Sequence, residues 1–439
     1  MWCGIFATLC ASPFKEFLLV MSVGKCPKNR RIRKSNSGRV QENCGKEVRV
    51  AEVPGTNMSI RALLAGARRK QASLVELTRR LVLAESPSDE KAAVDACMAL
   101  GAACARQLGG RVKLHRQRQL GDVLEARFGP QTPAARQDRA KPLLLLGHLD
   151  TVWPLGTLKT MPWRLSGGRM WGPGTLDMKA GVAMALTALE LLTEADLLRR
   201  EIVLLLNSDE EIGSLVSRPI IERLARGCEA VYVLEPAQGL AYKTARKGVG
   251  NWRVEVGGVA SHAGVDFEKG ANAILELARV IEKVSGWTDL KRGLTVSVGV
   301  AGGGTKSNVI PAHAWAEVEA RIVRRADAPR IERRFAALKP VDPRCTLTVT
   351  GGIDRPPMER GPGTVRLFRR AQALASELGF TLDEAATGGA SDGNLTAALG
   401  IPTLDGMGAV GEGAHARHES VLIRHLAPRT ALLAGMLMS

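Results

Sequence analysis

The sequence predicts an α/β protein in which helices flank a mostly parallel sheet and a smaller α+β domain is inserted. Three short apolar runs, at 143–146, 202–206 and 230–234, are each followed by polar residues, which is typical of buried parallel strands. From about 246 to 355 the pattern changes to the element order of a ferredoxin-like unit. A chain of 439 residues also exceeds one typical core, so two domains are expected.

The segment that precedes the inserted domain, 58–245, alternates helices with strands. Apolar residues at helical spacing predict the helices, and apolar runs bounded by turn residues predict the strands. Gly172-Pro173-Gly174 marks a tight loop. The expected elements are helices Leu74–Leu83, Glu90–Leu108 and Lys179–Leu192, and strands Val112–Gln117, Gly121–Phe128, the run beginning at Leu143, Ile202–Leu206 and Ala230–Leu234.

The inserted domain, 246–355, has its elements in the order βαββαβ, and 356–439 returns to the main domain. In that closing segment a helical region precedes the glycine-rich loop TGGASDG at 387–393. A short strand near Pro402–Leu404, a loop with His415 and a final helix at 427–437 follow. The elements of the inserted domain are expected at Trp252–Val256, Ala271–Val284, Leu294–Val300, Ala314–Val323, Arg330–Leu338 and Leu347–Thr350.

Composition and charge exclude several classes of protein. The chain is 45% hydrophobic and 24% charged, as ordinary globular proteins are. No stretch reaches the ~18 consecutive apolar residues of a membrane span. The formal net charge of +17 is accompanied by only 4% aromatic residues and no long basic run in the body, so no nucleic-acid platform is indicated. We expect neither a membrane nor a nucleic-acid partner; a basic surface that attracts anionic substrates explains the charge.

Residues 1–57 are predicted to be a disordered leader or a non-native extension upstream of the true start. Ten Lys and Arg between Lys15 and Arg49 follow the apolar residues, which is the wrong order for a secretory signal. In the body, Cys97 and Cys104 are expected to be small core residues, and no CxxC motif occurs. These features favour a cytoplasmic protein.

Polar residues follow each of the three predicted buried strands. His148 and Asp150 lie two residues apart after the first strand, so their side chains can point into one site. Because imidazoles and carboxylates meet at one edge of the sheet, a pair of divalent ions is indicated, and mixed nitrogen and oxygen ligands favour zinc. Of the adjacent Glu210 and Glu211, one can bind metal while the other stays free to accept a proton. The candidate set is His148, Asp150, Asp177, Glu210, Glu211, Glu235 and His415.

Five motifs carry a resemblance to a known family: GHLDTVWP, GPGTLDMKAG, NSDEEIGS, VLEPA and GEGAHARHE. Together they resemble the aminoacylase/carboxypeptidase G family of di-zinc metallopeptidases, from about residue 71 to the C-terminus. The amino-acid sequence around 147–179 and the loop TGGASDG are most similar to those of the glutamate carboxypeptidases. The resemblance implies a zinc-peptidase-type catalytic domain in two parts, 58–245 and 356–439, and a lid and dimerisation domain at 246–355.

The resemblance also implies two Zn²⁺ ions per chain and a role for each residue at the strand ends. Glu210 would be the general base that activates the water between the ions, and Asp150 would orient His148. His418 follows His415 by three residues, and the spacing to Glu419 favours His415 as the ligand. The implied metal ligands are His148, Asp177, Glu211, Glu235 and His415, with Asp177 shared by both ions.

Further implied roles lie in the lid and near the glycine-rich loop. His262, in GGVASHAG, matches a catalytic lid histidine that reaches across a homodimer to stabilise the oxyanion. Asn308, in KSNVIP, matches a lid asparagine near the same carbonyl. Arg321 matches an arginine that receives the substrate carboxylate, for which a guanidinium fork is well suited. The backbone at Gly389 would line that pocket.

These roles imply an enzyme that hydrolyses the amide bond to a C-terminal amino acid, glutamate in the nearest branch, in a small substrate with a free carboxylate. An N-acyl-amino-acid deacylase, of the acetylornithine or succinyl-diaminopimelate type, shares the metal set and is the first alternative. A catalytically silent metal-binding dimer is the second, and the complete ligand set with a free Glu210 argues against it. No sequence feature of the pocket separates the first two.

The remaining basic residues receive ordinary structural interpretations. Lys243, Arg246 and Lys247 precede the lid and are expected to form a solvated basic patch near the hinge. For His115, as for the histidines at 313 and 425, the sequence indicates no partner.

Overall fold

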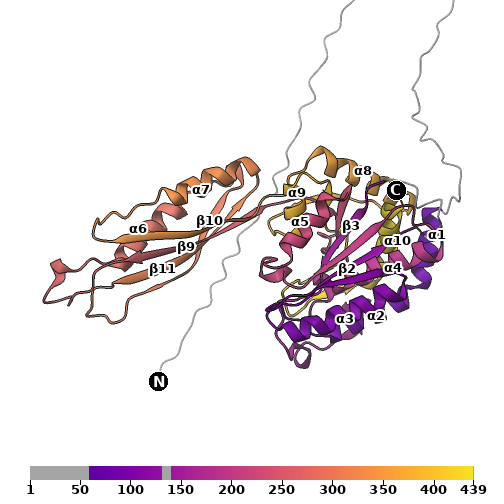
Figure 1. The fold of residues 1–439 in the computed structure, drawn as a ribbon, viewed down its shortest axis with the longest axis horizontal. Coiled ribbons are helices and arrows are strands. Elements are labelled where there is room, and N and C mark those ends of the chain that lie inside the picture. The colour runs from indigo at the N-terminus through magenta and orange to yellow at the C-terminus, as the bar shows by residue number, and fades with distance from the viewer. Residues whose placement is uncertain (1–58, 131–139, 439) are drawn as a thin grey trace, which may run out of the picture. The chain divides into compact units, whose positions relative to one another are not determined.

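A computed structural model describes residues 59–130 and 140–438, so the predicted leader 1–57 lies outside the described residues. A six-stranded sheet forms the centre of the main domain, in the strand order β1-β2-β6-β3-β7-β14 (Figure 1). Strands β6, β3, β7 and β14 are parallel, whereas β2 and β1 are antiparallel to their neighbours. The predicted mostly parallel sheet is confirmed. The strands are β1 (Arg111–His115), β2 (Val123–Phe128), β3 (Leu143–His148), β6 (Ile202–Asn207), β7 (Ala230–Val233) and β14 (Thr403–Leu404).

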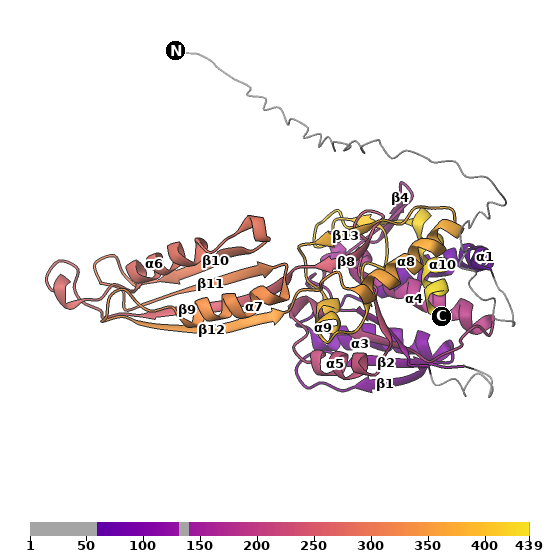
Figure 2. The same ribbon diagram turned by 90° about the horizontal axis from the view of Figure 1, so that it is seen from above.

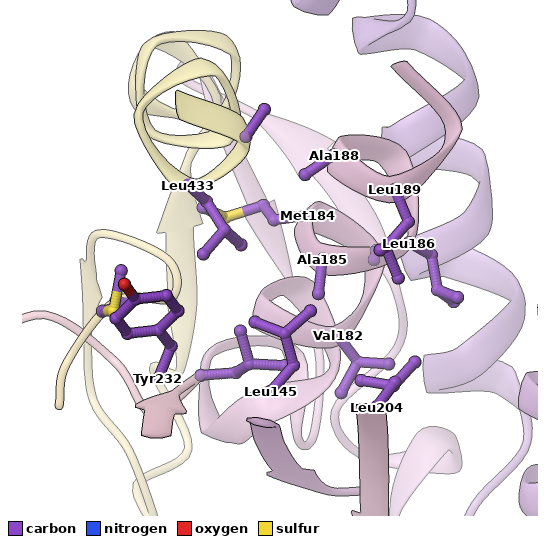
Figure 3. Close-up of a cluster of buried hydrophobic side chains, with 14 of the residues drawn as sticks. Leu145, Val182, Met184, Ala185, Leu186, Ala188, Leu189, Leu204, Tyr232 and Leu433 are labelled. Atoms are coloured by element: carbon purple, nitrogen blue, oxygen red, sulfur yellow. The ribbon is translucent and has the colours of Figure 1, made fainter. Parts of the chain in front are cut away.

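Helices cover both faces of this sheet because successive side chains of its strands point to opposite sides. Leu143 and Leu145 of β3 join one apolar core, and Leu144 and Leu146 join another. Figure 3 shows the first core, where α4 lies between Leu145 of the sheet and Leu433 of α10. Helices α1 (Ile60–Arg69), α2 (Gln71–Leu83), α3 (Lys91–Gln107), α4 (Ala180–Glu194), α8 (Pro362–Glu377) and α10 (Leu426–Leu437) contribute to the first core, and α5 (Arg218–Arg226) and α9 (Asp392–Ala398) to the second.

The inserted domain is a four-stranded antiparallel sheet in the order β10-β11-β9-β12 with two helices, as the ferredoxin-like prediction requires (Figure 2). Residues of both helices share one apolar core with the sheet, and Trp252 stacks on Phe335 with ring centroids 4.1 Å apart. The elements are β9 (Gly248–Gly257), α6 (Ala273–Ser285), β10 (Thr295–Gly303), β11 (His313–Ile322), α7 (Ala328–Ala336) and β12 (Thr346–Arg355).

Several elements were not anticipated from the sequence. Helix α1 begins after Ser59, whose side chain accepts a hydrogen bond from the Ala62 amide. Helices α5 and α9 were also not expected, and the remaining elements are short strands without an apolar run, which is the signal that predicts a strand. They form a second four-stranded sheet and a two-stranded parallel pair: β4 (Arg164–Ser166), β5 (Arg169–Trp171), β15 (Gly411–Glu412) and β16 (Ser420–Leu422), and β8 (Tyr242–Arg246) with β13 (Glu384–Thr387).

The main domain is closed by segments from both ends of the described chain. Helices α1 and α10 pack on each other and on α4, and the short strand β14 completes the sheet beside β7. The four cysteines of the described residues are buried and unbridged, as expected for Cys97 and Cys104. Among the helices of the described residues, none combines the length and apolar character that a membrane span requires.

Candidate metal centre

The candidate residues gather at one edge of the central sheet. Because β3, β6 and β7 are parallel, their carboxyl ends meet there, and this is where open α/β sheets bind ligands. His148 is the last residue of β3, and Glu235 follows β7 by two residues. Glu210 and Glu211 follow β6 in a single 3₁₀ turn. The strand ends therefore supply side chains to one site, as the sequence indicates.

The first cluster of potential ligands contains His148, Asp177 and Glu235. The Nε2 atom of His148 lies 3.3 Å from Asp177 Oδ1 and 3.7 Å from Glu235 Oε1. The His148 side chain is buried, and its Nδ1 atom lies 3.0 Å from the carbonyl oxygen of Asp150. The contact at Nδ1 leaves Nε2 facing the two carboxylates.

The second cluster contains Asp177, Glu211 and His415, so Asp177 belongs to both. The Nε2 atom of His415 lies 3.3 Å from Asp177 Oδ2 and 3.1 Å from Glu211 Oε2. His415 has a positive φ of 61° in the loop between β15 and β16, and its side chain is half exposed. Of the two nearby histidines, His415 and not His418 joins a cluster.

Asp177 is held by an irregular segment rather than by a regular helix. Its φ and ψ are −111° and 92°, and the peptide bond to Met178 is cis. Gly174 precedes it with a φ of 68°, and a Cβ atom there would lie 2.5 Å from Thr151. A glycine is therefore required at 174, both for the backbone conformation and for the close approach.

The two glutamates of the clusters, Glu211 and Glu235, resist ionisation because they are buried beside another carboxylate. Burial, and next the charge of Asp177, raises the pKa of Glu211 to about 7 although His415 donates to it. Burial and the same charge raise the pKa of Glu235 to about 8, against the effect of Arg246. Asp177 behaves differently: burial opposes its ionisation, but contacts with His148 and His415 outweigh it and hold the pKa of Asp177 well below the usual range.

The imidazoles show the complementary effect. Contacts with Asp177 and Glu211 raise the pKa of His415 to about 10, although partial burial opposes the charged form. Burial also opposes charging of His148, but contacts with Asp150 and Asp177 hold its pKa well above the usual value. The raised pKa values of the glutamates and histidines thus favour bound protons in the metal-free site. Divalent cations would bind the deprotonated ligands and displace these protons.

The donor set fits a pair of metal ions. In each cluster the ligand atoms lie within 4.8 Å of one another, and each cluster combines an imidazole with two carboxylates, as zinc sites do. Two buried atoms, His148 Nε2 and Glu211 Oε1, have no hydrogen-bond partner among the described residues. Since buried polar atoms are normally satisfied, both atoms are oriented as ligands would be.

Asp150 supports the site without joining either cluster. One of its carboxylate oxygens accepts hydrogen bonds from Ser88 Oγ at 2.7 Å and from the Glu211 amide at 3.1 Å. The other lies 3.4 Å from His148 Nδ1. Asp150 is fully buried and thus connects the histidine of the first cluster with the glutamate of the second.

Glu210 belongs to neither cluster. Its Oε1 atom lies 2.5 Å from Nη1 of Arg355, the last residue of β12. Nη2 of Arg355 donates to the Glu210 carbonyl at 3.0 Å and to Ser214 Oγ at 2.9 Å, and lies 3.3 Å from Asp392. Arg355 could not be predicted as a site residue, because nothing in its local sequence distinguishes it from a surface arginine.

Two of the predicted substrate-binding residues, Arg321 of the lid and Gly389 of the glycine-rich loop, lie close together. Nη1 of Arg321 donates to the Gly388 carbonyl at 3.0 Å, and its remaining guanidinium atoms form two contacts of 2.8 Å with Glu319. The next carbonyl, at Gly389, accepts from Arg246 at 3.1 Å. Arg321 and Gly389 are thus brought into one neighbourhood.

Arg246 corrects one expectation from the sequence. Arg246 and Lys243 are buried rather than part of a solvated patch. The Arg246 guanidinium forms two contacts of 2.7 Å with Asp405 and lies 3.5 Å from Glu235. Asp405 lies 159 positions after Arg246 in the chain, so no local pattern could indicate this pair.

His115 is a second correction, since its Nε2 atom contacts the Glu125 carboxylate at 2.7 Å although the sequence indicated no partner.

His262 and Asn308 lie beside each other, at the other end of the lid sheet from Arg321. The Ala263 amide donates to the Asn308 carbonyl at 3.0 Å, and His262 pairs with Val309 in an isolated bridge. Both side chains are exposed, and the His262 ring accepts from the Gly264 and Val265 amides.

Comparison with known proteins gives three findings. Residues 144–439 match the model of "Peptidase family M20/M25/M40". Carboxypeptidase G2 of Pseudomonas sp. (strain RS-16) is 33% identical over 307 residues, 68% of this chain and 73% of that protein. Succinyl-diaminopimelate desuccinylase of Stenotrophomonas maltophilia (strain R551-3) is 29% identical over 378 residues, 81% of this chain and 96% of the relative.

A solved structure supports the fold. The YXEP protein of Bacillus subtilis, described as a dinuclear metal-binding peptidase of family M20, superposes with a TM-score of 0.62 at 15% identity. The match covers 84% of this chain and 98% of that one. At this coverage the match extends over both the central six-stranded sheet and the inserted domain of this chain.

Proposed function

The chain belongs to the peptidase family M20/M25/M40 and is a metal-dependent hydrolase; on this premise we propose that it cleaves the amide bond to a C-terminal amino acid, glutamate in the first instance. The observation that carries the proposal is the pair of ligand clusters that share Asp177, with Glu210 beside the ligand Glu211 and outside both clusters. This arrangement supplies two ion sites and a separate base.

The residues of the site divide the work of hydrolysis. A pair of zinc ions, held by His148, Asp177, Glu211, Glu235 and His415, would polarise the scissile carbonyl and lower the pKa of water toward ~7. Glu210 accepts the proton of the attacking water at a carboxylate oxygen and passes it to the leaving amine. Asp150 keeps His148 oriented through the contact at Nδ1.

Recognition of the free carboxylate is assigned to Arg321 and the backbone near Gly389. A guanidinium fork binds a carboxylate through two parallel hydrogen bonds, and Arg321 already binds Glu319 in this way. The substrate carboxylate would replace Glu319 at the fork, while the contact with the Gly388 carbonyl keeps Arg321 at the pocket.

A deacylase of succinyl-diaminopimelate or acetylornithine remains the second candidate. It is favoured by the similarity to a desuccinylase, which extends over 96% of that protein. Both activities would use the same ligands and the same base. The two candidates differ only in which part of the substrate Arg321 contacts and in the leaving amine.

We assign 246–355 as a lid and dimerisation domain, and 58–245 with 356–439 as the catalytic domain. His262 and Asn308, from the partner's lid in a homodimer, would stabilise the oxyanion. Their position at the other end of the lid sheet from Arg321 supports a contribution across the dimer. The unbridged cysteines of the described residues support a reducing, cytoplasmic location.

The decisive experiment replaces the proposed base without disturbing the ligands. Glu210→Gln should lower kcat at least about 100-fold because the proton acceptor is lost, while the protein still binds two equivalents of zinc. Asp177→Ala should instead lose zinc. Turnover would be measured as amine release from benzoyl-glutamate, N-succinyl-diaminopimelate and N-acetylornithine, and metal content by elemental analysis.

Each outcome decides between the candidates. Zinc-dependent cleavage of benzoyl-glutamate supports the carboxypeptidase, and cleavage of the succinyl or acetyl compounds alone selects the deacylase. A Glu210→Gln protein with near-normal kcat would show that another group accepts the proton. Two bound ions without turnover of any compound would support the silent dimer.

A further inference from the structure

Glu419 lies behind the metal centre and is used neither as a ligand nor as the base. It directly precedes β16, four residues after His415, and it is completely buried. A buried carboxylate requires several hydrogen-bond donors to remain in an apolar interior. Its partners therefore indicate what this side chain holds in place.

Three of the four donors to the Glu419 carboxylate are backbone amides of the segment 174–177, which presents Asp177, and the fourth is Trp153, in the loop that follows His148. The Oε1 atom of Glu419 accepts from the Leu176 amide at 2.7 Å and from the Asp177 amide at 3.0 Å. Its Oε2 atom accepts from the Gly174 amide at 2.9 Å and from the Trp153 indole at 2.9 Å. The carboxylate thus binds the backbone on which Asp177 is mounted.

Three segments converge on this one carboxylate. The first is the loop that follows His148 at the end of β3, which contains Trp153. The second is the irregular segment 174–177, which presents Asp177. The third is the loop of His415, which ends at Glu419 itself. The segment 174–177 is not held by a regular hydrogen-bond ladder, as the dihedral angles of Asp177 show. External acceptors must therefore satisfy its amides and fix its position.

The position of Asp177 is critical because both of its oxygens are in use. Oδ1 faces His148 and Oδ2 faces His415, each at 3.3 Å. A carboxylate shared in this way cannot move toward one cluster without leaving the other. Any loss of its backbone anchors would affect both ion sites together.

We propose that Glu419 is a positioning residue that fixes the shared carboxylate of Asp177 between the two ion sites. The proposal rests on the two-ion site of the proposed function, but not on the choice of substrate. It makes a specific claim: Glu419 acts on both ions at once, whereas a ligand of one cluster acts on one ion. A role in folding alone would change stability and leave the metal affinities of the folded protein unchanged.

The test is a zinc titration of the metal-free protein by competition with a chromophoric chelator, which yields an affinity for each ion. In Glu419→Gln one oxygen becomes an amide nitrogen, which faces N–H donors and cannot accept from them. We expect both affinities to fall about 10- to 100-fold, the range for residues that orient ligands. His415→Ala, in contrast, should weaken one ion far more than the other.

A matched control comes from the same small sheet. Glu412 of β15 is exposed, and its carboxylate forms an ion pair with Arg169 at 3.0 Å. Glu412→Gln makes the same chemical change and should leave both affinities at the wild-type values. Thermal unfolding of each metal-free variant would measure any separate effect on folding.

The outcomes separate this proposal from the proposed function. Wild-type affinities in folded Glu419→Gln would overturn it, as would a loss confined to one ion or a wild-type protein that binds fewer than two. If Glu419→Gln loses affinity for both ions and the wild-type protein cleaves no compound of the panel, the role of Glu419 is supported and only the proposed hydrolytic function is rejected. If Glu419→Gln does not fold, Trp153→Phe removes one donor, and a parallel fall of about 2- to 10-fold for both ions is expected.

Discussion

Glu210 and Glu211 are neighbours in the chain, yet their side chains have different partners. Glu211 lies 3.1 Å from His415, whereas Glu210 contacts Arg355 at 2.5 Å. Arg355 also binds the Glu210 carbonyl, so it fixes the backbone as well as the carboxylate. This separation keeps the proposed base out of the ligand clusters. The contacts of Arg355 thus fix the position of the Glu210 carboxylate.

Arg355 should consequently affect the rate more than the metal content. We expect Arg355→Gln to lower kcat about 10- to 100-fold, the range for groups that orient functional side chains, with two zinc ions still bound. Arg355→Lys should recover part of the loss, since an ammonium can replace one of the contacts but not the fork. Steady-state kinetics and metal analysis would test both statements.

Arg360→Gln is the matched control, because this exposed guanidinium contacts only Glu384 among its described ion pairs. It should leave kcat unchanged. A wild-type kcat in Arg355→Gln would show that Glu210 does not depend on this contact.

At the scale of residues, the sequence predicted the side chains that follow apolar strands and missed those fixed by distant partners. His148 and Glu235 could be found because a buried strand ends just before each. Arg355 meets Glu210 across 145 positions, and Glu419 meets the Asp177 amide across 242. Such contacts depend on the completed fold, so no local pattern indicates them.

At the scale of elements, the parallel strands β3, β6 and β7 were predicted well because each is a continuous apolar run between turn residues. The small sheet around β16 was missed because its strands are only two or three residues long, too short to show a pattern. Strand β2 shows a further feature that pattern alone does not reveal. Its Glu125 is buried and contacts His115 at 2.7 Å and Arg127 at 2.6 Å.

This pairing predicts a pH dependence of stability. Burial opposes ionisation of Glu125, but hydrogen bonds with His115 and Arg127 outweigh it and hold its pKa below the ordinary value of 4.5. A carboxyl whose pKa is lowered by folding stabilises the fold above its unfolded pKa, and the contribution is lost as the pH falls through the folded pKa. Its contribution is therefore complete at neutral pH and declines below about pH 4.5.

Glu125→Gln should lower the free energy of unfolding by about 1–3 kcal/mol at neutral pH, because charged hydrogen bonds are lost in a buried position. The difference from wild type should shrink as the pH is lowered below the ordinary pKa. Urea unfolding of the metal-free proteins across this range would measure it. Glu229→Gln, which removes an exposed partner of Arg200, should cost about 0–1 kcal/mol. An effect of Glu125→Gln that stays constant with pH would contradict the assignment.

At the scale of the whole molecule, the lid sheet separates two groups that should act on one substrate. Arg321 pairs with Val249 at one end of β9, and His313 pairs with Gly257 at the other. His262 lies beyond Gly257, so at about 3.3 Å per residue the strand places His262 and Arg321 more than about 20 Å apart. One lid cannot bring both side chains to the same small substrate. A homodimer can, if each site takes Arg321 from one chain and His262 from the other.

Mixed dimers should therefore recover an activity that neither variant has alone. We expect His262→Ala and Arg321→Ala each to lose most turnover, because one loses the oxyanion donor and the other the carboxylate fork. After the two proteins are unfolded and refolded together, half of the dimers contain one chain of each kind. In such a mixed dimer one site combines the intact Arg321 of one chain with the intact His262 of the other, whereas the second site carries both substitutions. Half of the sites in half of the dimers are therefore intact, so about a quarter of wild-type kcat should return. Two His262→Ala preparations mixed in the same way provide the control and should stay inactive. If mixing restores nothing while sedimentation shows that mixed dimers form, both residues act within one chain or one of them has no role in catalysis.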